Sequence, residues 1–137
     1  MRVRFPLIAA AAAAVALVLP TADAFAGSKP SLTPSVQRVD CGNQAVDAGA
    51  KACGSVTFTN TASRSVQLVS QGIQERNAVD FLMGNSCTVP TMLAPGDSCV
   101  VSVSFNPVAS GRRSAKLTLY EGTLKTTSSV SLVGRGT

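Results

Sequence analysis

The sequence contains no histidine and no tryptophan, and it has only one tyrosine. Without histidine, the chain holds no Ser-His-Asp or Cys-His catalytic arrangement, since both need an imidazole base. The G-x-S-x-G, H-E-x-x-H and phosphate-binding P-loop patterns are missing as well. Nucleic-acid surfaces combine clustered basic residues with aromatic side chains for stacking, so we expect no nucleic-acid partner.

Acidic residues are scarce, seven against twelve basic ones. Asp40 and Asp47 flank turns, whereas Glu75 and Asp80 bracket a polar loop. A glycosidase needs two carboxylates that converge on one bond, and no two of these share a plausible site. We therefore expect no catalytic residues, no cofactor and no metal, and we predict that the protein is not an enzyme. A hydrolase with an unfamiliar site is a disfavoured alternative.

The formal net charge is +5, but the basic residues are scattered along the sequence. Arg112 and Arg113 are the one adjacent basic pair. A solvated, soluble surface explains this charge best. Weak attraction to an anionic envelope surface is the alternative.

The first 26 residues have the pattern of a cleaved signal peptide. Arg2 and Arg4 precede an apolar run over 7–19, which Pro20 ends. Small residues around Ala26 fit a cleavage site, with cleavage after Ala24 as the second choice. Thirteen apolar residues are short of the roughly 20 that a spanning helix needs, so we expect no stable membrane anchor after cleavage.

The rest of the chain predicts a single domain. Residues 27–34 are small or proline and read as a flexible lead-in, followed by an all-β domain over 35–137. Alternating apolar and polar residues between turn signals predict seven strands, at 36–41 with 45–46, 54–60, 65–70, 80–84, 99–105, 114–121 and 129–136. One apolar face per strand favours two sheets packed face to face, an immunoglobulin-like β-sandwich.

Four cysteines occur at Cys41, Cys53, Cys87 and Cys99. Zinc sites and redox dithiols use closer spacings than these, so structural disulfides in an exported protein are favoured. Four cysteines allow three connectivities, which sequence alone leaves open. The sequential pairs, each enclosing eleven residues, are preferred because they close local loops.

The stretch "CTVPTMLAPGDSCVVSVSFNPVASGRRSAKLTLYEG" (87–122), with "SVSLVGRGT" (129–137), resembles the bacterial immunoglobulin-like domains of the ASPM/Hydin (ASH) type found in choice-of-anchor D proteins. Upstream, "VTFTNTASRSVQL" (56–68) is similar to that family's strand-turn-strand, so the resemblance spans about 34–137. It implies a seven-stranded sandwich related to major sperm protein and pilus-chaperone domains. It also implies a non-catalytic scaffold or binding role.

The resemblance also implies the Cys87–Cys99 bridge, which bacterial members commonly show. Cys41 stands where the family usually has phenylalanine, so Cys41 and Cys53 are interpreted as a second, lineage-specific disulfide. Two further departures are a single copy where the family often has tandem arrays, and a chain that stops at its last strand.

Candidate binding residues come from the irregular segment 70–86 and its surroundings. Met83 and Met92, with Leu93, are candidates for an exposed apolar patch, although filling the end of the core is the favoured explanation. Arg112 and Arg113 are candidates for holding a partner, and pairing of a partner strand at a sheet edge is a second route. The oligomeric state is open.

Together these features predict an exported, periplasmic or extracellular, non-catalytic binding or scaffold module. Its expected partner is another envelope or extracellular protein. The alternative is a periplasmic chaperone or assembly factor for a surface structure.

Overall fold

Nine strands form two sheets in the part of the chain that the computed structural model describes, residues 29–84, 87–122 and 126–137. In spatial order, the four-stranded sheet contains β1 (Leu32–Pro34), β3 (Lys51–Asn60), β7 (Ser98–Phe105) and β5 (Phe81–Met83). The five-stranded sheet contains β2 (Arg38–Gln44), β9 (Thr126–Gly136), β8 (Gly111–Glu121), β4 (Val66–Gln74) and β6 (Thr91–Leu93). The expected signal peptide, residues 1–26, lies outside the described residues.

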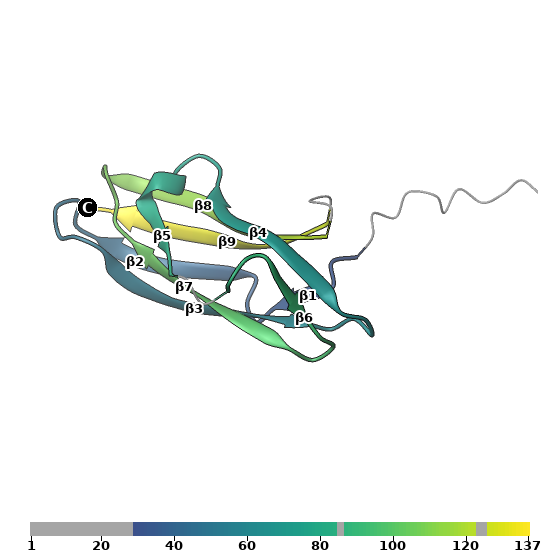
Figure 1. Cartoon of the computed structure of the whole chain (residues 1–137). Coiled ribbons are helices and arrows are strands. Elements are labelled where there is room, and N and C mark those ends of the chain that lie inside the picture. The colour runs from purple at the N-terminus through teal and green to yellow at the C-terminus, as the bar shows by residue number, and fades with distance from the viewer. Residues whose placement is uncertain (1–28, 85–86, 123–125) are drawn as a thin grey trace, which may run out of the picture.

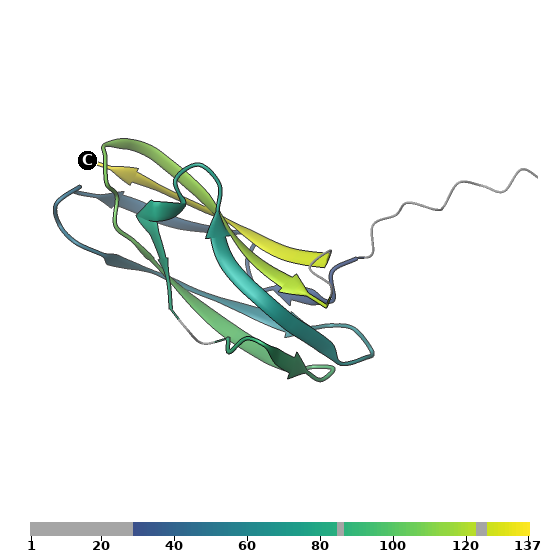
Figure 2. The ribbon, with the colours of Figure 1, turned by 45° about the horizontal axis from the view of Figure 1, so that its top comes forward.

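The two sheets lie face to face as separate layers (Figures 1 and 2). Neighbouring strands are antiparallel except β2, which runs parallel to β9. One short 3-10 helix, η1 (Ala78–Asp80), interrupts the strands of the described chain. The predicted all-β, two-layer sandwich is therefore confirmed.

The strand count differs from the seven expected, because two three-residue strands have no alternation to reveal them. One is β6, and the other is β1, which falls inside the segment expected to be a flexible lead-in. Leu32 of β1 is 2% exposed and belongs to the core. The sandwich thus begins before residue 35, the boundary expected from the sequence.

The first long strand also differs in outline. Instead of two pieces at 36–41 and 45–46, β2 is one strand whose register against β9 shifts between Asp40 and Asn43. Gly42 lies at this irregularity with a φ of 66°, a conformation that glycine adopts at little cost.

The core lies between the sheets and is built from the inward-facing alternate residues of the long strands. The side chains that are almost fully buried include Val56, Phe58, Leu68, Val101, Val103, Phe105, Leu117, Leu119, Val130 and Leu132. The residues that alternate with them along each strand, on the opposite face, are mostly polar. This burial of one face per strand is what the alternating sequence predicts.

The two sheets approach each other closely where Phe105 of β7 faces Gly134 of β9. A Cβ atom placed on Gly134 would lie 2.7 Å from two ring carbons of Phe105. Phe105 is fully buried and its ring also packs 5.0 Å from that of Phe81, centroid to centroid. The absence of a side chain at position 134 is therefore a packing requirement.

We expect Gly134→Ala to lower the free energy of unfolding by about 1–3 kcal/mol, because the added methyl group overpacks this part of the core. Urea denaturation of the purified domain measures the change. Gly72→Ala on β4 is the matched control, since a Cβ there meets nothing within 4 Å. Equal stability losses in the two variants would contradict the assigned close approach.

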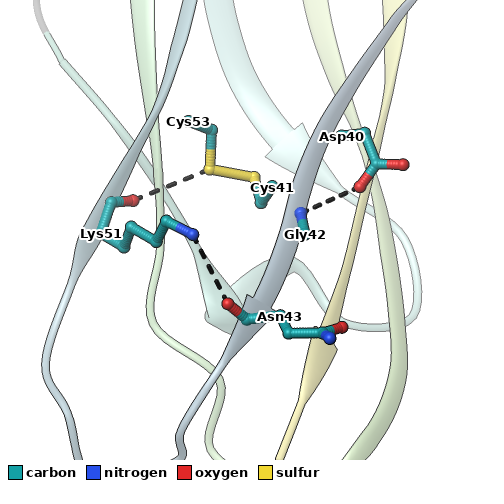
Figure 3. Close-up of a disulfide and its surroundings, with 6 residues drawn as sticks. All are labelled: Asp40, Cys41, Gly42, Asn43, Lys51 and Cys53. Atoms are coloured by element: carbon teal, nitrogen blue, oxygen red, sulfur yellow. Dashed lines mark hydrogen bonds between the residues drawn. A yellow bond between two sulfur atoms is a disulfide. The ribbon is translucent and has the colours of Figure 1, made fainter.

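Two disulfides join residues that the sequence separates by 12 positions, Cys41 with Cys53 and Cys87 with Cys99. This is the sequential connectivity. The first bridge links β2 of one sheet to β3 of the other (Figure 3). Beside it, the Nζ of Lys51 donates a hydrogen bond to the carbonyl oxygen of Asn43, 3.5 Å away. The second bridge ties the loop before β6 to β7.

We expect Cys41→Ala/Cys53→Ala to lower the free energy of unfolding by about 2–4 kcal/mol, because the unfolded chain gains the freedom that a loop of this size removes. The Cys87–Cys99 bridge closes a loop of the same length, so Cys87→Ala/Cys99→Ala should lower the free energy of unfolding by a similar amount. Urea denaturation without reductant measures both. An unchanged midpoint in either double variant would contradict the role of that bridge.

Candidate functional site

The segment between β4 and β5 makes a tight reversal that carries η1. Glu75, directly after β4, has a φ of 78°, which few residues other than glycine adopt. The amide of Ala78 donates to the carbonyl of Glu75 at 3.1 Å, and that of Asp80 to the carbonyl of Asn77 at 3.0 Å. These bonds shape the reversal and direct Asp80 inward.

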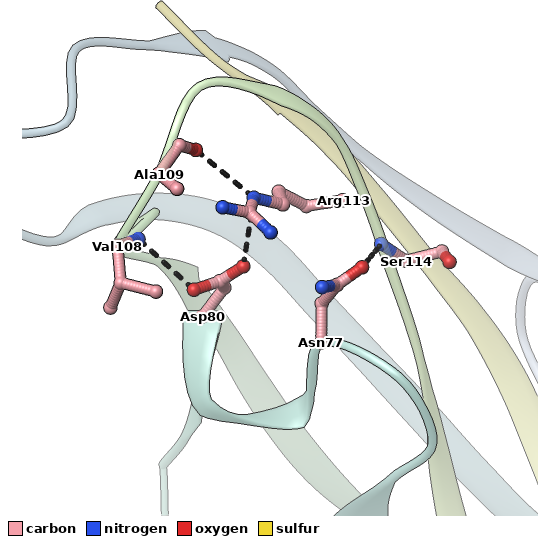
Figure 4. Close-up of polar contacts among 6 residues, drawn as sticks. All are labelled: Asn77, Asp80, Val108, Ala109, Arg113 and Ser114. Carbon is pink, nitrogen blue, oxygen red and sulfur yellow. Dashed lines mark hydrogen bonds and ion pairs between the residues drawn. The ribbon is translucent and has the colours of Figure 1, made fainter.

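Asp80 is a fully buried carboxylate, with 0% of the residue exposed. Its Oδ1 accepts a hydrogen bond from the amide of Val108 at 3.0 Å (Figure 4). Its backbone carbonyl accepts from the amide of Asn106 at 2.7 Å. A buried charge is tolerated when it is paired and hydrogen-bonded. Asp80 obtains its hydrogen bonds from the segment that joins β7 to β8, and its counter-charge comes from β8.

Arg113 supplies the opposite charge. Its Nε lies 3.2 Å from Oδ2 of Asp80, and its side chain is 15% exposed. The N–H of that Nε points at the carbonyl of Ala109, 3.0 Å away, so Oδ2 gains the attraction of the guanidinium without accepting a directed hydrogen bond. Arg113 thereby holds the carboxylate and the loop backbone together.

Asn77 adds a second clamp. Its side-chain Oδ1 accepts a hydrogen bond from the backbone amide of Ser114 at 3.1 Å. Its backbone amide donates a hydrogen bond to the carbonyl oxygen of Ser114 at 3.0 Å. Figure 4 shows Asn77 and Asp80 reaching the two sides of the same loop. We name residues 75–82 and 106–114 together the η1 corner. It lies at the end of the sandwich that also holds the C-terminus (Figure 1).

The η1 corner presents aliphatic side chains to solvent. Val79 is 75% exposed, Val108 61% and Leu82 47%. The bonds around Asp80 fix the backbone at Val79 and Val108, and the pairing of β5 with β7 fixes Leu82. Little conformational freedom would therefore be lost if a partner covered these side chains. Exposed apolar residues on rigidly held loops are typical of protein-binding surfaces. Sequence reasoning pointed to the segment 70–86 but missed Val79 and Val108, because nothing in the sequence distinguishes a buried Asp80 from a solvated one.

The apolar candidates named from the sequence do not form one patch. Met83 packs partly buried against the core on β5, and Leu93 is buried. Met92 is 59% exposed, but it lies on β6, in the other sheet. The favoured explanation, that this region fills the end of the core, holds for Phe81, Met83 and Leu93.

The two candidate arginines do not act as a pair, because successive residues of a strand point to opposite faces. Arg113 turns to the inner side and meets Asp80, whereas Arg112 is exposed on the outer face of the five-stranded sheet. Of the two, only Arg112 is available to a ligand.

A second buried carboxylate, Glu121, lies at the end of β8. It accepts hydrogen bonds from the amides of Leu32 at 2.9 Å and Ser31 at 3.1 Å, and lies 3.2 Å from the hydroxyl of Ser128. These bonds anchor β1 to the other sheet. Asp80 and Glu121 are thus each engaged in structural contacts.

Within residues 29–84, 87–122 and 126–137, no group of three or more histidine, cysteine or acidic side chains could hold a metal ion. The same residues include no helix with the length and apolar character needed to cross a membrane.

No protein-family model and no curated protein matches the sequence of this chain. Solved structures do match its fold. The secreted serine protease VesC from Vibrio cholerae superposes with a TM-score of 0.59 and 22% identity over 80% of this chain, which spans 24% of VesC. The ASH/PapD-like domain 7 of human CEP192 gives 0.53 and 12% identity, covering 96% of this chain and 98% of that domain.

The periplasmic chaperone SfaE gives a TM-score of 0.50 and 11% identity over 77% of this chain and 57% of the chaperone. These identities are low, so the likeness concerns the fold. The fold is an ASH/PapD-like immunoglobulin sandwich, as the resemblance in sequence implies. The chain spans about a quarter of VesC and nearly all of the CEP192 domain.

We expect Asp80→Asn to lower the free energy of unfolding by about 3 kcal/mol, because it leaves the mostly buried guanidinium of Arg113 without its counter-charge. Glu75→Gln is the matched control. It removes the ion pair with Lys116 (2.6 Å), whose side chains are about half exposed, and such a pair contributes about 0–1 kcal/mol. Chemical denaturation of the two variants compares them. A similar small cost for both would show that the Asp80 pair does not hold the η1 corner.

Proposed function

We propose that this chain is an exported, non-catalytic immunoglobulin-like module that binds another envelope or extracellular protein through the η1 corner. The observation that carries the proposal is the exposure of Val79 and Val108 on backbone fixed by the buried Asp80–Arg113 pair. Because these valine side chains are exposed, they contribute little apolar burial to the stability of the isolated protein. A partner that covers them gains apolar burial.

Export is supported by the signal-like residues 1–26 and by the disulfides, which persist in oxidising compartments. SfaE, whose fold is similar, is itself a periplasmic chaperone. A non-catalytic role is supported by the lack of histidine in the sequence and by the structural use of Asp80 and Glu121. The match to the ASH/PapD-like domain of CEP192, which covers almost the whole of that domain, fits the same role.

The alternative, a chaperone or assembly factor, would hold a client by pairing with a sheet edge. Among the described residues, the edge strands β1, β5 and β6 have three residues each, and β2 is irregular at Gly42. Short and irregular edges resist the addition of a long strand. These features favour a binding module over a chaperone.

We expect Val79→Ser/Val108→Ser to weaken partner capture by about 10- to 100-fold, since burial of each valine side chain is worth about 1.5 kcal/mol and tenfold in affinity is about 1.4 kcal/mol. The assay is affinity purification from envelope extracts with a C-terminally tagged protein, followed by titration of the recovered protein. Val36→Ser/Val100→Ser is the matched control, because these valines are exposed on other parts of the sandwich.

Both double variants should keep the wild-type Tm, which separates loss of binding from loss of fold. Repeated recovery of no stoichiometric protein, or equal capture by wild type and Val79→Ser/Val108→Ser, would overturn the proposal.

A further inference from the structure

A hollow of about 260 Å³ lies on the outer face of the five-stranded sheet, across β2, β9 and β8. Three arginines from these three strands line it: Arg38, Arg112 and Arg135. Val133, on the same outer face of β9, lies between them. In the sequence these arginines are 23 or more positions apart, and sheet pairing brings them together.

The strand register places two of the arginines directly opposite each other. Arg112 of β8 pairs with Arg135 of β9 in the antiparallel ladder, so their Cβ atoms are about 5 Å apart. Both are exposed. Like charges in such a cross-strand pair repel and destabilise the sheet.

The charge in the hollow is only partly balanced. Arg38 has a counter-charge in Asp40, with Nη2 3.8 Å from Oδ2. The Oδ1 of Asp40 is also occupied, since it accepts the amide hydrogen of Gly42 at 2.9 Å. Arg112 and Arg135 form no ion pair with any residue that the structure describes. Two adjacent guanidinium groups therefore stand without a counter-charge.

We infer that this hollow binds a tetrahedral oxyanion, phosphate or sulfate. Guanidinium groups present paired N–H donors whose spacing matches two oxygens of such an ion, and they hold it more specifically than ammonium groups. The volume admits the ion with several waters, since each water takes about 30 Å³. A bound dianion also removes the repulsion between Arg112 and Arg135.

Arg112 falls within the residue range of the η1 corner, but its side chain lies on the outer face of the five-stranded sheet, whereas Arg113 turns inward to Asp80. The inference therefore does not rest on the proposed function. The oxyanion has two possible sources: a free ion, or a phosphate group on an anionic lipid. Both share the chemistry that the arginines recognise, and the test separates them.

The experiment measures Tm in a phosphate-free buffer and then with added inorganic phosphate, at ionic strength matched with sodium chloride. Phosphate at tenfold its Kd should raise the wild-type Tm by roughly 4 °C or more. Arg112→Gln should raise the Tm slightly without phosphate, because the repulsion is gone, and should abolish the phosphate-dependent rise. Arg64→Gln is the matched control: it removes an exposed arginine between β3 and β4, outside both the hollow and the η1 corner, and should keep the full response.

A second arm uses co-sedimentation with phosphatidylglycerol vesicles and with phosphatidylcholine vesicles. Binding to the anionic vesicles that Arg112→Gln abolishes assigns the source to a lipid headgroup. A phosphate response without vesicle binding assigns it to a free ion. The inference is overturned if neither ligand binds, or if Arg112→Gln and Arg64→Gln respond alike.

Discussion

The ring of Phe105 in one sheet lies against the backbone of Gly134 in the other, and the placement of the arginines on β8 and β9 follows from that contact. Because Gly134 faces inward, its neighbours Val133 and Arg135 face outward on β9. The ladder with β8 then sets Arg112 beside Arg135 outside and Arg113 inside. One packing requirement in the core thus decides which arginine stabilises the fold and which one meets solvent.

The alternation of apolar and polar residues was sufficient to predict an all-β sandwich and its long strands, such as β7 and β8. It does not reveal β1 or β6, since three residues show no period. Nor does it reveal that Asp80 is buried, because its partners Val108 and Arg113 lie about 30 positions away. The alternation along one strand indicates which face of the sheet a residue lies on. Which distant residues it contacts depends on the register between strands, and alternation does not give that register.

The dependence on strand register also explains why the cluster of arginines is not visible in the sequence. Read along the sequence, the basic residues are scattered and suggest a general surface charge. Read across the sheet, Arg38, Arg112 and Arg135 share one hollow, and two of them are opposed without a counter-charge. The protein therefore offers two chemically distinct surfaces, an aliphatic corner fixed by a buried ion pair and a cationic hollow on one sheet face. The disulfides and core hold both in place.

We propose that a partner protein covers the η1 corner. Site-specific photo-cross-linking in cells tests it most directly, with a photoreactive residue at position 79 or 108, and at position 36 or 100 for comparison. We expect one discrete cross-linked product from positions 79 and 108 and none from the other two. Products from positions 36 and 100 alone, or the same diffuse products from all four, would contradict it.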